Sequence, residues 1–179
     1  MMVPHFTVRL AEPADIARLN RLIHASARGL GAGYYSAAET EAAIAHVFGV
    51  DSELVADGTY LVIESGGELA GCGGWSRRRT LFGGDNFAGR DSGLLDPATD
   101  AAKIRAFFVA PAFARRGVAR LLLEECEARA RAAGFARLDL MATLPGVPFY
   151  AASGFVGDAA VALDLGGIPV RFIPMSKTL

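Results

Sequence analysis

A short basic segment in the second half of the sequence has the residue types of an anion site. Arg115, Arg116 and Gly117 follow an apolar stretch at 104–109, which is typical of a strand, and precede a helical pattern at 118–133. The first turn of a helix carries unpaired amides and the positive end of the helix dipole, and both attract anions. The order of strand, glycine turn and helix therefore predicts a place where a phosphate could bind.

The side chains around this turn also suit a phosphate. Gly117 has no Cβ to obstruct a close approach, and Ala119 keeps the next turn slim. Arg115, Arg116 and Arg120 add mobile positive charge. By itself, such a segment is more often an ordinary capped turn than a phosphate site. The interpretation therefore depends on the rest of the sequence.

Two further segments accompany this turn. Phe107-Phe108-Val109-Ala110-Pro111 precedes it, and Phe149-Tyr150-Ala151-Ala152-Ser153-Gly154-Phe155 follows the next expected strand. Together the three segments resemble the GNAT (GCN5-related) superfamily of N-acetyltransferases. The residues that match the family's pyrophosphate motif and its later segment are Gly117, Ala119, Phe149, Tyr150, Gly154 and Phe155.

Two positions depart from the family pattern. Ala114 stands at the first position of the pyrophosphate motif, where the family usually has glutamine or arginine. Thr143 stands where an asparagine is common. These departures remove polar anchors but leave phosphate binding by the backbone possible.

The resemblance implies that acetyl-CoA is the cosubstrate. In the family, the strand corresponding to 104–109 splays from the one corresponding to 136–142, and pantetheine lies in the gap. An amide near Phe108 or Val109 would then polarise the thioester carbonyl. The cofactor-binding residues implied in this way are Phe108, Val109, Arg115, Arg116, Gly117, Val118, Ala119, Arg120 and Thr143.

The resemblance also points to Tyr150 as the catalytic acid. A phenol has a pKa of about 10, against about 8.5 for a simple thiol. The hydroxyl would stay protonated at neutral pH and could donate a proton to the departing thiolate. The alternative is that Tyr150 merely packs beside Phe149 and Phe155.

The base that deprotonates the amine is not evident from the sequence. An amine with a pKa of about 10.4 is almost wholly charged at neutral pH, so a base or a water chain is needed. The expected strand at 104–109 contains no carboxylate or histidine. Glu39, His46, Glu64 and Asp139 are candidates, although a solvated or paired role is commoner for each.

Other aromatic and basic residues have less specific patterns. Tyr34, Tyr35 and Trp75 could line an acceptor pocket, although packing is the commoner use of such side chains. Arg77-Arg78-Arg79 are interpreted as a solvated strand edge that resists sheet pairing. His5 and His24 lack nearby residues of metal-ligand type, so no metal is expected.

The elements that must position these residues follow from periodicity and turn signals. Ser36, with Glu39 three residues later, is typical of a helix N-cap. The region at 77–101 is polar and glycine-rich without a period, which predicts a long loop with a possible functional role. The expected helices lie at 16–27, 37–47, 118–133 and 149–153, and the strands at 7–10, 59–64, 68–76, 104–109, 136–142, 161–165 and 170–175.

The composition and the charge balance exclude some classes of function. The 18 Lys and Arg residues nearly balance the 19 Asp and Glu residues, so no overall charge attracts nucleic acid or an anionic membrane. Cys72 and Cys126 lack the spacing of a zinc site or a disulfide framework, which favours reduced thiols. The sequence shows neither an export signal nor a long apolar run, so a cytoplasmic protein is expected.

These features together predict one α+β domain over residues 1–179, with a mixed, mostly antiparallel sheet, a central splay and about four flanking helices. Residues 1–103 would form the acceptor-side half with the long loop at 77–101. Residues 104–155 would form the acetyl-CoA-binding core, and residues 156–179 the C-terminal hairpin. An exposed edge on this hairpin makes a homodimer possible.

The function expected from this resemblance is transfer of an acetyl group from acetyl-CoA to a primary amine, on a small molecule or a peptide. No paired nucleophile and base indicates a covalent intermediate, so direct attack in a ternary complex is expected. The main alternative is a non-catalytic module on the same fold that binds or senses acyl-CoA. A third possibility is a domain that binds protein partners through the arginine triplet and the long loop.

Overall fold

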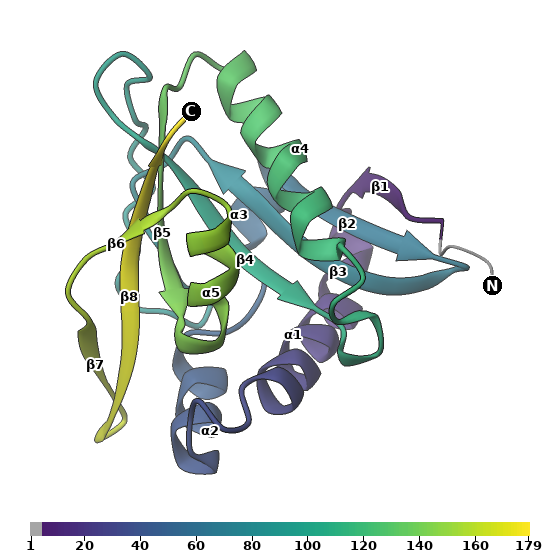
Figure 1. Cartoon of the computed structure of the whole chain (residues 1–179), viewed down its shortest axis with the longest axis vertical. Helices are drawn as coiled ribbons and strands as arrows, with labels where there is room; N and C mark the ends of the chain where they lie inside the picture. Colours follow the sequence, from purple (N-terminus) through teal and green to yellow (C-terminus); the bar gives the residue numbers. More distant parts are fainter. Residues whose placement is uncertain (1–4) are drawn as a thin grey trace.

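A single mixed sheet organises residues 5–179, which are the residues that the computed structural model describes (Figure 1). Residues 1–4, on which the expectation of no export signal partly rests, lie outside them. The eight strands run in the order β1-β2-β3-β4-β5-β8-β6, and β7 pairs with β8. The strands are β1 (Thr7–Leu10), β2 (Tyr60–Ser65), β3 (Glu68–Ser76), β4 (Ala102–Val109), β5 (Arg137–Thr143), β6 (Val156–Gly157), β7 (Val161–Leu165) and β8 (Ile168–Thr178).

Five α-helices accompany the sheet, and local signals explain most of them. The helices are α1 (Ile16–Leu30), α2 (Ala37–His46), α3 (Ser52–Ala56), α4 (Val118–Ala132) and α5 (Val147–Ala152). The Ser36 hydroxyl accepts from the Glu39 amide at 3.1 Å, and the Glu39 carboxylate accepts from the Ser36 amide at 3.1 Å. This capping box confirms the predicted start of α2. The short helix α3 has no periodic signal, and the sequence did not predict it.

The helices lie on both faces of the sheet. Successive side chains of a strand alternate between faces. Accordingly, Leu61 and Ile63 of β2 pack into one hydrophobic cluster, and Tyr60 and Val62 pack into another. The first cluster contains the apolar residues of α4, and the second contains those of α1 and α2. The sheet therefore separates two layers of helices.

The middle of the sheet opens between β4 and β5. These strands are parallel and share only the pairs Ala102 with Leu138 and Lys103 with Asp139. Figure 1 shows them starting near one another and separating toward their arrowheads. The predicted central splay is thus confirmed.

A bulge in β4 precedes the opening. The β3–β4 register passes from Gly74 opposite Arg105 to Cys72 opposite Phe108, so Ala106 and the residue after it face Gly73 together. Ala106 has a φ of 50°, which is strained for a residue with a side chain. The Tyr60 hydroxyl holds the bulge by donating to the Ala106 carbonyl at 2.9 Å.

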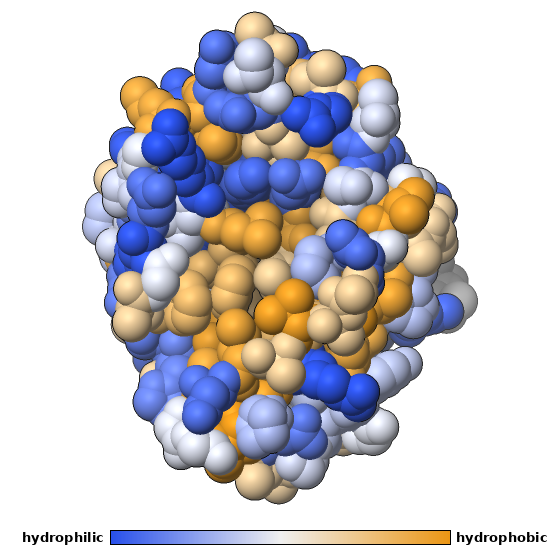
Figure 2. All heavy atoms as spheres, turned by 90° about the vertical axis from the view of Figure 1, so that its left-hand side faces the viewer, coloured by the Kyte–Doolittle hydropathy of each residue, from blue (hydrophilic) through white to orange (hydrophobic). Residues whose placement is uncertain are grey.

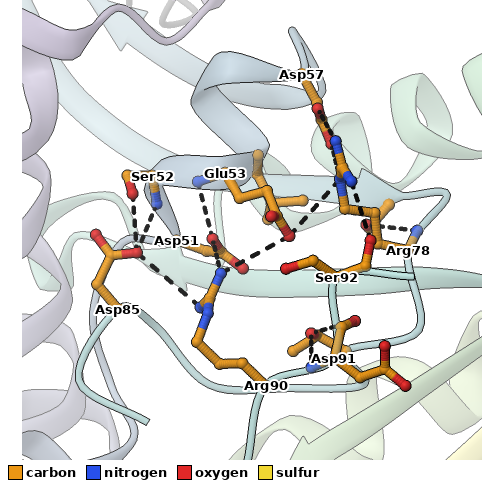
Figure 3. A network of polar contacts seen from close by, with 12 residues as sticks. Asp51, Ser52, Glu53, Asp57, Arg78, Asp85, Arg90, Asp91 and Ser92 are labelled. Carbon is orange, nitrogen blue, oxygen red and sulfur yellow. Dashed lines mark hydrogen bonds and ion pairs between the residues drawn. The ribbon is translucent and has the colours of Figure 1, made fainter. Parts of the chain in front are cut away.

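The long loop at 77–101 is held by ion pairs (Figure 3). Arg78 donates to both carboxylate oxygens of Asp57, at 2.7 and 2.8 Å. Arg90 donates to Asp51 Oδ1 at 2.7 Å. These contacts tie two places in the loop to the segment that carries α3, so the loop is ordered by charge rather than by regular secondary structure.

The most deeply buried ion pair lies beneath this loop. Arg105 of β4 donates to Asp51 Oδ2 at 2.8 Å, and both side chains are 1% exposed. Arg105 also donates to the carbonyls of Thr80 at 3.1 Å and Gly83 at 2.6 Å. A buried charge is tolerated only when it is paired and hydrogen-bonded. This one arginine therefore joins β4, the start of α3 and the loop.

The structure corrects one expectation and refines another. Arg77-Arg78-Arg79 do not form a solvated sheet edge, because β3 lies between β2 and β4 and Arg78 pairs with Asp57. The C-terminal hairpin forms as predicted, but β8 has strand partners on both sides. Only its shorter neighbours, β6 and β7, are outer strands at that end. None of the helices within residues 5–179 has both the length and the hydropathy to cross a bilayer.

We expect Asp51→Ala to lower the free energy of unfolding by about 3–5 kcal/mol, because Arg105 would stay buried without its carboxylate. Urea denaturation measures this loss. Glu41→Ala is the control, since it removes the exposed partner of Arg28 and should cost far less. Equal losses in the two variants would contradict the importance assigned to the buried pair.

Candidate functional site

One large cavity occupies the opening between β4 and β5. Its volume is about 1130 Å³, and both strands, the turn before α4, and α5 contribute to its wall. Tyr150 and every cofactor-binding residue implied by the resemblance line it. These residues are Phe108, Val109, Arg115, Arg116, Gly117, Val118, Ala119, Arg120, Thr143 and Tyr150. The fold therefore brings into one place residues that are far apart in the sequence.

The turn at 114–120 presents a run of unpaired amides to the cavity. Ala114 N donates to Pro111 O at 3.2 Å, and Leu121 N donates to Gly117 O at 3.0 Å. Between these two, no amide from Arg115 to Arg120 donates to any other residue within 5–179. Such a run at the start of a long helix is a suitable cradle for phosphate oxygens.

Backbone conformation shapes this cradle. Arg115 has a φ of 64° and Gly117 a φ of 88°, so both lie in the left-handed region. A Cβ built on Gly117 would meet nothing within 4 Å, which means that the space in front of it is open. The side chains of Arg115, Arg116 and Arg120 are exposed. None of them forms an ion pair with an acid in the described part of the chain.

Tyr150 of α5 combines a buried ring with a hydroxyl that makes no hydrogen bond to residues 5–179. Its ring centroid lies 5.1 Å from that of Phe149, 5.6 Å from Phe155 and 6.4 Å from Phe107. The residue is only 8% exposed, yet it lines the cavity. Burial raises the pKa of the hydroxyl above its ordinary value of about 10. The aromatic packing and a role as proton donor are therefore compatible.

The edge of β4 supplies a backbone donor. Ala110 N donates to Ala70 O at 2.9 Å. Bonded and non-bonded pairs alternate along an antiparallel ladder, so Val109, opposite Gly71, belongs to a non-bonded pair. Its N–H points away from β3 toward the opening, whereas that of Phe108 faces β3. Of the two amides suggested by the sequence, the one that faces the cavity is that of Val109.

The candidate bases do not line this cavity. Glu39 caps α2, and Glu64 accepts from Arg9 at 2.8 Å. Asp139 pairs with Lys103 at 3.0 Å, and His46 lies beside the turn between β7 and β8. The carboxylates that do line the cavity are Glu124 and Glu127 of α4, which the sequence analysis did not select. They are regular helix positions, so no local signal distinguishes them.

Two of the three aromatic residues considered for an acceptor pocket line the cavity. Tyr34 and Tyr35 line the cavity, as suggested. Trp75 does not, because it is buried in the core, with its ring 6.2 Å from that of Phe135. The sequence analysis also missed Phe48, Phe82 and Phe172, which line the cavity from three separate segments. Within residues 5–179, no group of His, Cys, Asp and Glu side chains has the arrangement of a metal site.

Comparison with known proteins gives the context of this site. The model of the acetyltransferase (GNAT) family matches residues 30–155. A GCN5-related N-acetyltransferase from Rhodopseudomonas palustris is 23% identical, with a TM-score of 0.70, over 100% of this chain and 98% of that chain. The PaiA N-acetyltransferase from Thermoplasma acidophilum in complex with coenzyme A is 16% identical, with a TM-score of 0.65, over 98% and 99%.

A GNAT family acetyltransferase from Brucella melitensis in complex with acetyl-CoA is 22% identical, with a TM-score of 0.55, over 85% of this chain and 83% of that one. At such identities the likeness to these structures shows the fold. A search of curated proteins found no match.

The buried Tyr150 hydroxyl should remain protonated when the solution reaches about pH 11, one unit above the ordinary phenol pKa. We therefore expect wild type and Tyr150→Phe to show the same tyrosinate absorbance at that pH. A lower absorbance in Tyr150→Phe than in wild type would show that Tyr150 ionises freely.

Proposed function

Because the chain belongs to the GNAT family of acetyltransferases, we propose that it transfers the acetyl group of acetyl-CoA to a primary amine by direct attack in a ternary complex. One observation carries this proposal. A single cavity joins a cradle of unpaired amides, an outward-facing amide on β4 and the hydroxyl of Tyr150. These three features together suit an acyl transfer from a thioester that carries a pyrophosphate.

The residues of the turn fit the pyrophosphate of the cosubstrate. The amides from Arg115 to Arg120 have no partner within residues 5–179, and the space before Gly117 is open. The three arginines of the turn add positive charge without being neutralised by acids. Ala114 contributes no polar side chain, so phosphate binding would rest on the backbone and on these arginines. Thr143, on the opposite wall, would contact the cosubstrate further along the cavity.

When bound, acetyl-CoA supplies an acetyl group activated as a thioester. The Val109 amide would donate a hydrogen bond to the acetyl oxygen, on which negative charge develops during attack. The amine nitrogen forms the new C–N bond as the C–S bond breaks. Tyr150 would donate its proton to the departing sulfur, which its raised pKa permits across the physiological range. The proton released by the amine passes to water.

Direct attack is supported by the state of the cysteine thiols. Cys72 and Cys126 are both buried, and neither lines the cavity. Burial raises the pKa of Cys72 to about 12 and that of Cys126 still further above its ordinary value. The thiolate is the nucleophilic form of cysteine. Neither residue is therefore suited to carry the acetyl group.

Gly117→Val should weaken acetyl-CoA binding at least tenfold, because the added side chain would fill the approach to the amides. Isothermal titration measures the change. Gly67→Val is a matched control, since Gly67 has a φ of 82° and nothing within 4 Å of a built Cβ, but lies in the β2–β3 turn. Both variants should lose stability to backbone strain, but only the first should lose affinity. Unchanged affinity in Gly117→Val would place the pyrophosphate elsewhere.

Tyr150→Phe should lower the rate of CoA thiol release by about a hundredfold, with acetyl-CoA affinity unchanged, because only the proton donor is lost. Leu94→Ala, at an exposed position that does not line the cavity, is the control and should stay near wild type. Full activity of Tyr150→Phe would contradict the role as acid. Tight acetyl-CoA binding by wild type without thiol release from any amine would favour the sensing module instead.

A further inference from the structure

The cavity has two halves, one on each face of the sheet. Phe107, Val109 and Tyr150 line it and pack in the cluster that contains α4. Phe108 and Phe172 line it and pack in the cluster that contains α1 and α2. The α4 half includes the turn at 114–120, which is the proposed place of the pyrophosphate. The other half, on the α1 and α2 side, is then left for the acceptor and is called the acceptor half.

Aromatic rings form a continuous wall in the acceptor half. Phe48 lies 5.3 Å from Phe108 and 6.3 Å from Phe172, measured between ring centroids. Phe82 lies 6.0 Å from Phe172, and Tyr35 lies 6.3 Å from it. All of these residues line the cavity. The aromatic wall is defined as Tyr35, Phe48, Phe82, Phe108 and Phe172.

Hydrogen bonds and packing hold this wall in position. The Tyr35 hydroxyl donates to the Arg171 carbonyl at 2.6 Å and accepts from the Leu144 amide at 3.0 Å, so its polar end is satisfied away from a ligand. Phe82 packs against Phe87 at 4.6 Å and precedes Gly83, whose carbonyl accepts from the buried Arg105. The wall is therefore a preformed surface, which reduces the entropic cost of binding.

Charged residues line only the α4 half of the cavity. Within residues 5–179, the charged side chains of its lining are Arg115, Arg116, Arg120, Glu124, Glu127 and Lys177. All but Lys177 lie in the 114–120 turn or on α4, and Lys177 pairs with Glu127 at 2.5 Å. A second ammonium or a carboxylate placed against the aromatic wall would find no charged partner. Burying such an unpaired charge is costly.

Apolar residues also gather on one outer face of the molecule. Figure 2 shows the face that lies on the left in Figure 1, where β8 and β7 run. Apolar residues gather around a hollow in the middle of this face, and hydrophilic residues border them (Figure 2). Phe172 of the aromatic wall belongs to β8 but is only 2% exposed, so it lies beneath this surface rather than in it.

We propose that the acceptor is a primary amine attached to an aromatic or similarly bulky apolar group, with no second charge, whose body packs on the aromatic wall. This rests on the proposed function and adds the substrate class. Polyamines and free amino acids are excluded as preferred acceptors, because the second charge of either would be desolvated without a partner. An apolar body instead gains from burial against the rings.

The same wall assists deprotonation of the acceptor. Removal from water disfavours the charged form of an amine and lowers its pKa. An ammonium group entering the acceptor half would lose its proton to water more readily than in solution. The neutral, nucleophilic amine can thus form although no carboxylate or imidazole within residues 5–179 lines this half.

Steady-state thiol release at saturating acetyl-CoA tests the proposal with 2-phenylethylamine, ethylamine, phenylalanine and spermidine. The expected kcat/KM for 2-phenylethylamine is about a hundredfold or more above that of each other amine. Ethylamine lacks the ring, phenylalanine adds a carboxylate, and spermidine replaces the ring with further ammonium groups. The first two comparisons therefore each isolate one feature of the acceptor, and the third changes two.

Variants of Phe82 test whether the aromatic wall causes the preference for 2-phenylethylamine. This residue is chosen because it is only half-buried, so its replacement should leave the core folded. Phe82→Ala should lower kcat/KM for 2-phenylethylamine about tenfold more than that for ethylamine, because only the first amine has a ring that packs on the wall. Phe82→Asp should shift the preference toward spermidine, because it adds the missing anion. Leu94→Ala, an exposed position in the same loop, is the control.

The outcomes separate this inference from the proposed function. If no amine gives thiol release, the result contradicts both the proposed function and this inference. Release that favours spermidine or phenylalanine in wild type would overturn only the inference. The inference would also be overturned if Phe82 variants changed the preference among acyl-CoA chain lengths but not among amines. The aromatic wall would then hold the acyl group rather than the acceptor.

Discussion

The separation of β4 and β5 is the constraint on which the rest of this structure depends. Parallel neighbours in a sheet normally pair along their length, yet these two share only two residue pairs. The bulge at Ala106, held by the Tyr60 hydroxyl, precedes the separation. Beyond it, the outward-facing backbone groups of β4 have no strand to pair with. The sheet thereby gains an opening and a free amide at Val109, at the cost of local strain.

The buried Arg105 joins this opening to the long loop. Arg105 directly precedes the bulge residue Ala106 in the sequence. Its guanidinium donates hydrogen bonds to Asp51 and to the carbonyls of Thr80 and Gly83. Desolvation by burial lowers the pKa of the guanidinium below its ordinary value, and Asp51 counteracts that shift. A charge in such a place fixes its partners, because each broken contact would leave it unsatisfied. A glycine-rich loop that could otherwise move is thus held against the acceptor half.

The cavity is divided electrostatically, and the division matches two chemical tasks. At the α4 half, unpaired amides and exposed arginines favour an anion. At the acceptor half, aromatic rings exclude water and favour a neutral group. Val109 and Tyr150 line the cavity and pack in the cluster that contains α4. A negatively charged cosubstrate and an uncharged nucleophile can therefore meet without either environment compromising the other.

The sequence by itself determined the elements whose signals are local. The Ser36 cap, the hairpins and the glycine turn before α4 each depend on neighbouring residues, and the motif around Gly117 and Tyr150 is carried by short contiguous segments. Only the tertiary structure decided the burial of Trp75, the pairing of Arg78 and the aromatic wall. Those features bring together side chains from segments far apart in the chain. Periodicity and motif spacing describe neighbours along the chain, whereas contacts across a sheet depend on strand order and register, which no local signal contains.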